Sequence, residues 1–169
     1  EQNRYFLEMA HQYFHQRGFT HIRDMSGNIK LWELLQERED RQDLKLYIEE
    51  NFTCENIDDF ERALQEALLA KKTESQHLRV YGIKFYFDGA LGSQGAFLSE
   101  PYAGTDQRGL TLWPLNDVRE AIKRTWQAGL AVSVHTIGDE AAHQVLTVAS
   151  QVWREGIRGQ LNVEHGEML

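Results

Sequence analysis

The feature that most constrains the fold is an alternation of short apolar segments with longer amphipathic ones along the whole chain. Five segments have strand-like composition, and they are residues 19–25, 44–52, 83–88, 130–135 and 160–165. Apolar side chains at helical spacing fill the intervals, at residues 2–17, 29–35, 56–68, 116–127 and 140–155. Strands separated by helices of this size predict an α/β fold with a parallel sheet and right-handed crossovers, in either a doubly wound sheet or a (β/α) barrel.

The first helical segment is expected to bury one face. Its apolar stripe comprises Tyr5, Phe6, Met9, Ala10, Tyr13 and Phe14. His11 and His15 lie four residues apart, which is a spacing that can hold zinc, but no third ligand lies nearby in the sequence. We therefore expect these two histidines to be surface or core residues.

Length and composition limit the classes of protein to which the chain can belong. With 169 residues it is expected to form a single domain, residues 1–169, and its hydrophobic content of 41% is typical of a globular protein. No apolar run is long enough to cross a bilayer, so no membrane partner is expected. The net charge of -8 argues against a nucleic-acid partner. The single cysteine, Cys54, excludes an internal disulfide and leaves the compartment undetermined, with the cytoplasm favoured.

The third strand-like segment has two unlike faces. Successive side chains of a strand point to opposite faces. One face is therefore apolar, with Ile83, Phe85 and Phe87, and the other is polar, with Lys84, Tyr86 and Asp88. Burying an amine and a carboxylate is costly unless these groups are paired or bind something. The alternative is that Lys84 is an ordinary edge-strand lysine in water.

Three residues capable of binding a metal fall on three successive strands, and they are Lys84, His135 and His165. In parallel α/β folds the carboxyl ends of the strands build the active site, so these side chains are expected to converge. The two histidines are expected at equivalent positions of adjacent strands, and neutral imidazole is the commonest protein metal ligand.

Four segments together resemble the third family of the amidohydrolase superfamily, which contains N-substituted formamide deformylase-like enzymes. They are RGFTHIRDMSG, IKFYFDGALGSQGAFLSEPY, AGLAVSVHTIGDEAAHQVL and LNVEHGEML. The resemblance implies a TIM-type (β/α)8 barrel, of which this chain is a fragment covering about strands two to six, with about five parallel strands alternating with helices.

The resemblance also implies a catalytic metal site. Lys84 matches the family's fourth-strand lysine, which is carbamylated and bridges two metals in such enzymes, and His135 and His165 match the ligands of the fifth and sixth strands. The implied cofactor is one or two divalent ions, with zinc favoured. The implied reaction is hydrolysis of a carbon–nitrogen bond other than a peptide bond in a small amide-type substrate, by metal-activated water.

Three further residues match family positions near the substrate, and they are Asp88, Ser93 and Asp139. Turn and helix-cap roles explain them equally well. The family's usual arginine in the glycine loop is replaced here by Gln94. The loop at residues 88–109 holds five glycines and is expected to be a pocket wall or lid, the alternative being a segment that is disordered in a fragment.

Two elements of the family pattern have no counterpart in this sequence: a His-x-His pair on the first strand and an aspartate on the eighth. The chain alone is therefore expected to be inactive, to bind metal weakly or not at all, and to keep Lys84 unmodified. Exposed strand edges are expected to make it self-associate. A non-catalytic regulatory or binding member of the same family is the alternative, while a nucleotide-binding domain is disfavoured because the GALGSQG segment does not open a helix.

Overall fold

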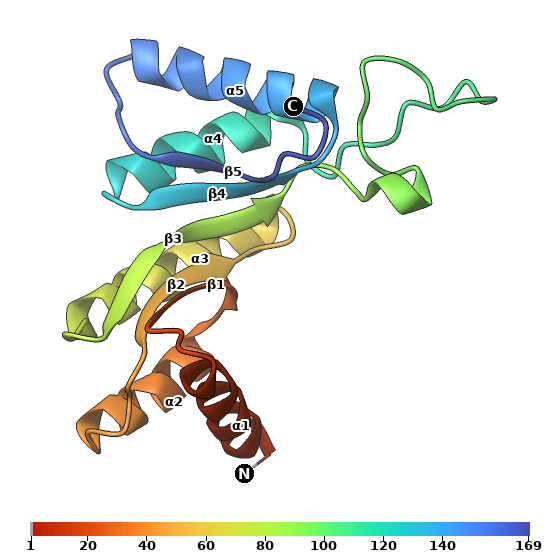
Figure 1. Ribbon diagram of the computed structural model, residues 1–169. Helices are drawn as coiled ribbons and strands as arrows, with labels where there is room; N and C mark the ends of the chain where they lie inside the picture. The colour runs from red at the N-terminus through yellow and green to blue at the C-terminus, as the bar shows by residue number, and fades with distance from the viewer. Residues whose placement is uncertain (1) are drawn as a thin grey trace.

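A computed structural model describes residues 2–169, which form one parallel sheet covered by helices. Its strands are β1 (His21–Gly27), β2 (Tyr47–Thr53), β3 (Leu78–Tyr86), β4 (Ala131–Thr136) and β5 (Leu161–His165). The strands lie in chain order, β1-β2-β3-β4-β5, and every neighbouring pair is parallel (Figure 1). A doubly wound sheet reverses its strand order at a switch point, whereas a barrel does not. The fold is therefore a partial TIM-type barrel, which is the one of the two predicted architectures that the family resemblance implied.

Helices alternate with the strands along the chain. They are α1 (Gln2–Gln16), α2 (Ile29–Asp40), α3 (Ile57–Ala70), α4 (Leu115–Gln127) and α5 (Asp139–Arg154), with two short 3-10 helices at η1 (Lys71–Thr73) and η2 (Leu91–Ser93). Asn56 caps α3 by accepting a hydrogen bond from the Asp59 amide at 3.0 Å, at the residue where the sequence predicted this helical segment to begin. Asn28 caps α2 in the same way through the Leu31 amide. No helix within residues 2–169 is both long and apolar enough to cross a membrane.

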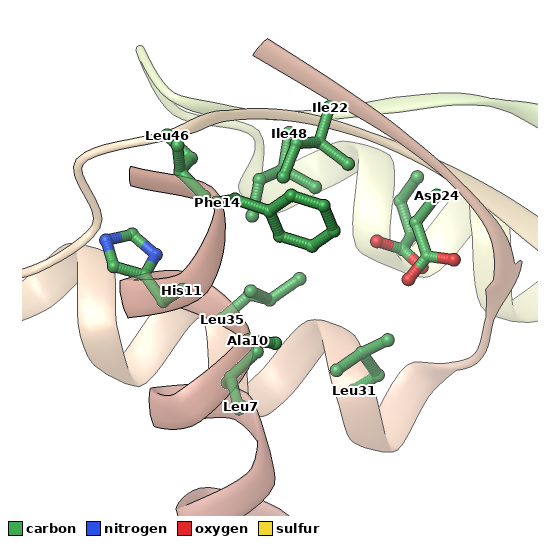
Figure 2. A pocket seen from close by; sticks show the side chains of 11 residues that line it. Leu7, Ala10, His11, Phe14, Ile22, Asp24, Leu31, Leu35, Leu46 and Ile48 are labelled. Atoms are coloured by element: carbon green, nitrogen blue, oxygen red, sulfur yellow. The ribbon is translucent and has the colours of Figure 1, made fainter. Parts of the chain in front are cut away.

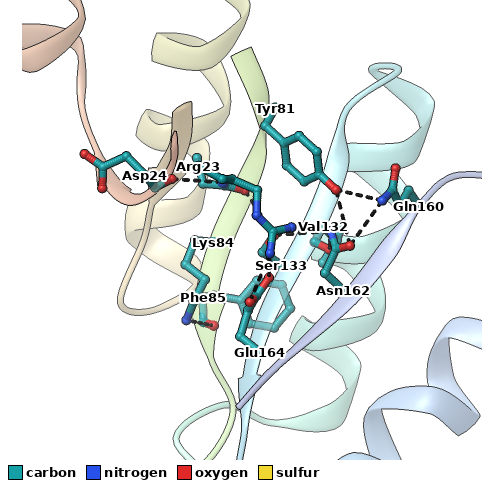
Figure 3. A network of polar contacts seen from close by, with 11 residues as sticks. Arg23, Asp24, Tyr81, Lys84, Phe85, Val132, Ser133, Gln160, Asn162 and Glu164 are labelled. Carbon is teal, nitrogen blue, oxygen red and sulfur yellow. Dashed lines mark hydrogen bonds and ion pairs between the residues drawn. The ribbon is translucent and has the colours of Figure 1, made fainter. Parts of the chain in front are cut away.

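The two faces of the sheet differ in chemistry. The face covered by helices is mainly apolar, and Ile83, Phe85, Phe87, Val132 and Val134 are buried in its core. The opposite face, here called the inner face, carries the polar side chains of alternate residues, among them Arg23, Asn51, Lys84, Ser133 and Glu164. The sheet curls so strongly that Arg23 of β1 contacts Glu164 of β5 (Figure 3). This curvature is that of a half-barrel.

The strand that carries Lys84 lies in the middle of the sheet. β3 pairs with β2 on one side and β4 on the other, so the alternative of an edge-strand lysine in water is wrong. β3 also begins five residues earlier than the sequence predicted, at Leu78. Its pairing with β2 shifts register between Glu50 and Asn51, a bulge that the alternation of side chains alone could not reveal.

The predicted buried stripe of α1 is wrong for most of its residues, although Phe14 does pack on the core. Tyr5 is 62% exposed, and Phe6, Met9 and Tyr13 are also about half exposed or more. The side that packs on the rest of the protein consists of Leu7, His11 and Phe14. The helix is apolar over more than half of its circumference, so periodicity could not tell which part faces the sheet. His11 is a core residue whose Nε2 accepts a hydrogen bond from the Lys45 amide at 3.3 Å.

Candidate functional site at the carboxyl edge of the strands

Lys84, His135 and His165 lie near the carboxyl ends of β3, β4 and β5, on three adjacent strands. The ring centroids of the two histidines are 4.5 Å apart. Tyr86 links them to the lysine, because its ring lies 3.7 Å from Lys84 Nζ and 5.5 Å from the His135 ring. The fold thus brings the three predicted ligands together at one edge of the sheet, with a tyrosine ring among them.

Lys84 is almost completely buried, with 2% of its surface exposed. Its Nζ donates a hydrogen bond to the Phe85 carbonyl at 3.1 Å. Burial lowers the pKa of this amine to about 8, against the opposing effect of the Glu164 carboxylate. A larger fraction of neutral amine is therefore present near neutral pH than for a lysine in water.

His135 has a ring nitrogen with unmet bonding capacity. Its Nε2 is buried, makes no hydrogen bond within residues 2–169, and lies 3.8 Å from Asp88 Oδ1. Burial lowers the pKa of the imidazole, and so do the neighbouring His165 and Lys84. A neutral imidazole with a free buried nitrogen is the form that binds a metal ion, so this side chain fits the ligand role.

The two histidines are not register equivalents, which corrects the sequence-based expectation. His135 pairs with Glu164, and His165 lies one residue further along, opposite Thr136. Side chains alternate along a strand, so Glu164 shares the inner face with His135. His165 ends β5 with φ at 75°, a left-handed conformation, and its ring still packs against His135.

Sequence reasoning missed Glu164 and Arg23. Glu164 Oε1 lies 3.0 Å from Arg23 Nη2, and the guanidinium also stacks over the Tyr81 ring at 5.0 Å (Figure 3). The same inner face carries hydrogen bonds from Tyr81 to Asn162 and from Ser133 to Asn51. The alternation of side chains along β5 could have revealed Glu164. Glu164 comes just before the strand-terminal His165, so the two side chains are expected on opposite faces of the sheet.

Asp88 holds the backbone beside the site. Its carboxylate accepts hydrogen bonds from the amides of Phe97 at 3.0 Å, Ile137 at 2.9 Å and Gly138 at 2.8 Å. The glycine is required there, because a Cβ at residue 138 would lie 1.9 Å from the Phe97 carbonyl oxygen. Asp88 therefore fastens the glycine loop to the turn after β4, which fixes the backbone that follows His135.

The other two predicted substrate residues lie on the same loop and at the start of α5. Ser93 is exposed and its Oγ donates to the Ala90 carbonyl at 3.1 Å. Asp139 accepts hydrogen bonds from the Ser99 amide, at 2.9 Å, and from the Ser99 hydroxyl, and these bonds lower the pKa of its carboxyl group. Ser93 thus makes a turn contact, Asp139 joins the start of α5 to the glycine loop, and contact with a substrate stays a prediction at both residues.

The glycine loop projects away from the sheet between β3 and α4 (Figure 1). It is held by Asp88 and Asp139, and by the Tyr102 hydroxyl, which donates to the Ala96 carbonyl at 2.9 Å. Beyond it, Trp113 Nε1 donates to the Glu55 carbonyl at 2.8 Å. These contacts place the loop beside the carboxyl edge, where a pocket wall would lie.

The donor set available in this chain is small. Between residues 2 and 169 there is no group of three or more histidine, cysteine, aspartate or glutamate side chains that could hold a metal ion. The two histidines and Lys84 are three candidate donors, and the lysine becomes an anionic ligand only if its amine is modified. The site thus fits part of a metal centre.

The structure is of the partial TIM-type barrel class. Its parallel strands lie in chain order and curl into a half-barrel, and a buried lysine and two histidines lie at the carboxyl edge. The model of the amidohydrolase family matches residues 1–169. The chain belongs to the amidohydrolase family.

Relatives of the chain are considerably longer than the chain itself. It is 28% identical to Protein LONG AFTER FAR-RED 3 of Arabidopsis thaliana, over all of this chain and 31% of that protein. It is similar to the crystal structure of an uncharacterized metal-dependent hydrolase from Pyrococcus furiosus, with a TM-score of 0.77 and 27% identity over 94% of this chain and 32% of that one. A second such hydrolase, from Pyrococcus horikoshii OT3, has a TM-score of 0.77 at 23% identity, over 94% of this chain and 31% of that one, and shows the same fold. The chain spans about a third of the length of these proteins.

Proposed function

We propose that this chain carries part of the active site of a metal-dependent amidohydrolase that cleaves a carbon–nitrogen bond other than a peptide bond. The observation that carries the proposal is the cluster of buried Lys84, half-buried His135 and exposed His165 at the carboxyl edge, with 4.5 Å between the ring centroids of the histidines. Membership of the amidohydrolase family and the likeness to a metal-dependent hydrolase support the reaction class. Within that class we propose a formamide deformylase-like enzyme acting on a small amide-type substrate.

His135 and His165 would hold a divalent ion, with zinc the proposed metal. The unpaired buried Nε2 of His135 is the observation in favour, because an orphaned buried nitrogen is costly without a partner. The metal, when bound, lowers the pKa of a water molecule and polarises the scissile carbonyl.

Lys84 would contribute as a carbamate. A neutral amine attacks carbon dioxide to form a carbon–nitrogen bond and loses one proton, which leaves an anionic carboxylate at the end of the side chain. The pKa of Lys84 at about 8 favours this reaction by supplying neutral amine near neutral pH. Tyr86, whose ring covers Nζ, and Phe85, whose carbonyl accepts its hydrogen bond, would orient the amine toward the histidines.

The remaining polar residues would shape and position the site. Asp88 fixes the backbone after His135 through three amide hydrogen bonds, and the proposed substrate contacts come from the loop that it anchors. We propose that Asp88, Ser93 and Asp139 form the part of the site that binds the substrate.

We further propose that the 169-residue chain is inactive by itself. It offers three candidate donors, and a two-metal centre with a carbamate bridge requires more. Weak metal binding and an unmodified Lys84 are the expected properties of the isolated chain.

The experiment is metal analysis combined with a hydrolysis screen on the whole protein, using N-substituted formamides, other amides and peptide controls. The proposal expects bound divalent metal and cleavage of a non-peptide amide that a chelator abolishes and added zinc restores. A folded whole protein with neither metal nor activity would instead favour the non-catalytic regulatory or binding alternative.

A further inference from the structure

A second polar site lies on the face of the sheet covered by helices, away from the carboxyl edge. Asp24 of β1 and Glu50 of β2 are directly opposite each other in the parallel register. Neighbouring strands place such side chains within reach of each other, and two acidic groups in this arrangement repel. The pair therefore calls for a compensating partner.

Glu50 has no such partner within this chain as far as the structure describes it. Its exposed fraction is 0%, and neither Oε1 nor Oε2 makes a hydrogen bond. A buried carboxyl group without partners costs free energy in any protonation state. Burial, with a smaller effect from Asp24, raises the pKa of Glu50 to about 9. At neutral pH the pair thus carries no more than one negative charge.

A cavity of about 90 Å³ adjoins the two carboxyl groups. Figure 2 shows Asp24 at one side of it and His11 at the other, with Phe14 between them. The remaining walls are hydrocarbon, and they come from α1, α2 and the first two strands, with Leu7, Leu31, Leu35 and Ile48 among them. The volume is smaller than that of an engineered protein cavity that binds benzene, which is about 150 Å³.

We propose that this cavity binds a small primary alkylammonium ion, with the ammonium group on Asp24 and Glu50 and the alkyl chain among the apolar side chains of α1 and α2. An ammonium group donates three hydrogen bonds, which match the unpaired carboxyl oxygens of Glu50 and the half-exposed carboxylate of Asp24. A divalent metal ion is the poorer fit, because magnesium and calcium require six or more oxygen ligands and the other walls offer apolar groups.

The test measures the thermal stability and binding heat of the protein with propylammonium chloride, using equal concentrations of sodium chloride and of 1-propanol as references. We expect the melting temperature to rise by about 5 to 10 °C at a ligand concentration about 100 times the dissociation constant. Glu50→Gln should weaken binding at least about tenfold, since the ammonium ion displaces the Glu50 proton to solvent and binds the carboxylate, a charged acceptor that glutamine cannot form. Glu49→Gln is the matched control and should bind normally, because Glu49 faces the opposite side of β2 and pairs with His21.

Asp24→Asn is a second, independent variant, and it alters a half-exposed side chain. It too should weaken binding. An equal response to sodium chloride or to 1-propanol would overturn the proposal, and so would normal binding by either carboxyl variant.

Discussion

Arg23 of β1 and Glu164 of β5 form an ion pair with 3.0 Å between Nη2 and Oε1, although three strands lie between them in the sheet. Such a contact requires a sheet that is curled toward its inner face, because strands in a flat sheet are about 4.8 Å apart and the first and fifth would be far out of reach. The pair lies beside Lys84 and just before His165, so it connects the curvature of the half-barrel to the candidate metal site (Figure 3).

Removing this ion pair should destabilise the fold. Glu164→Gln leaves the partly buried guanidinium of Arg23 without its carboxylate, and we expect the free energy of unfolding to fall by about 1 to 2 kcal/mol. Urea denaturation measures the change. The control is Glu37→Gln, which breaks the exposed Arg4–Glu37 pair and should cost no more than about 0.5 kcal/mol. Equal effects of the two variants would contradict a structural role for the inner pair.

The Asp88 carboxylate should be essential for holding the glycine loop. Asp88→Asn keeps the size of the side chain but replaces one acceptor oxygen by the NH2 group of a carboxamide, a donor that would face backbone N–H donors, so a loss of about 2 to 4 kcal/mol in unfolding free energy is expected. Limited proteolysis should also cut the loop at residues 88–109 faster. Asp106→Asn, at an exposed loop position, is the control and should change neither quantity. An intact, protease-resistant loop in the Asp88 variant would disprove the anchoring role.

Because of Glu50, the free energy of unfolding should fall as the pH rises above about 4.5. The pKa of Glu50 is about 9 in the folded protein and close to 4.5 unfolded, so between these values the folded state holds a proton that the unfolded state has released. The contribution of Glu50 to the free energy of unfolding is therefore fully present below about pH 4.5 and is lost as the pH rises toward 9. Glu50→Gln, which mimics the protonated group, should be about 1 to 3 kcal/mol more stable than the wild type at pH 7 and about equal to it at pH 4. Denaturation curves at the two pH values decide this, and a difference that does not change with pH would contradict it.

The outer strands should promote self-association. β1 and β5 each pair with a neighbour on one side within residues 2–169, and unpaired strand edges invite pairing with another copy. We expect the sedimentation coefficient of the 169-residue chain to increase with concentration. A single monomeric species up to the highest concentration would show that the edges do not associate.

Much of the architecture could be read from the sequence because it depends on local patterns. The alternation of Ile83, Phe85 and Phe87 with Lys84 gave the two faces of β3 correctly, and the cap at Asn56 marked the start of α3. The order of strands and helices followed from the same periodicities. Chain order then favoured a barrel once the strands were seen to lie without a reversal.

Long-range geometry was the part that could not be predicted. The apolar residues of α1 cover more than half of the helix, so only the packing against the sheet shows that Leu7 and His11 face inward while Tyr5 faces out. The pairing of His135 with Glu164 depends on a register that no local signal specifies. The solitary carboxyl group of Glu50 became evident only when its surroundings were known.

The central claim is that Lys84, His135 and His165 are metal ligands, and the most direct test is the metal content and zinc affinity of ligand variants of the whole protein. His135→Ala and His165→Ala should each lose bound zinc or weaken its affinity at least about tenfold, since each removes a direct ligand. His143→Ala, on the exposed side of α5, is the matched control and should bind zinc like the wild type. Full zinc content and unchanged affinity in both ligand variants would contradict the account.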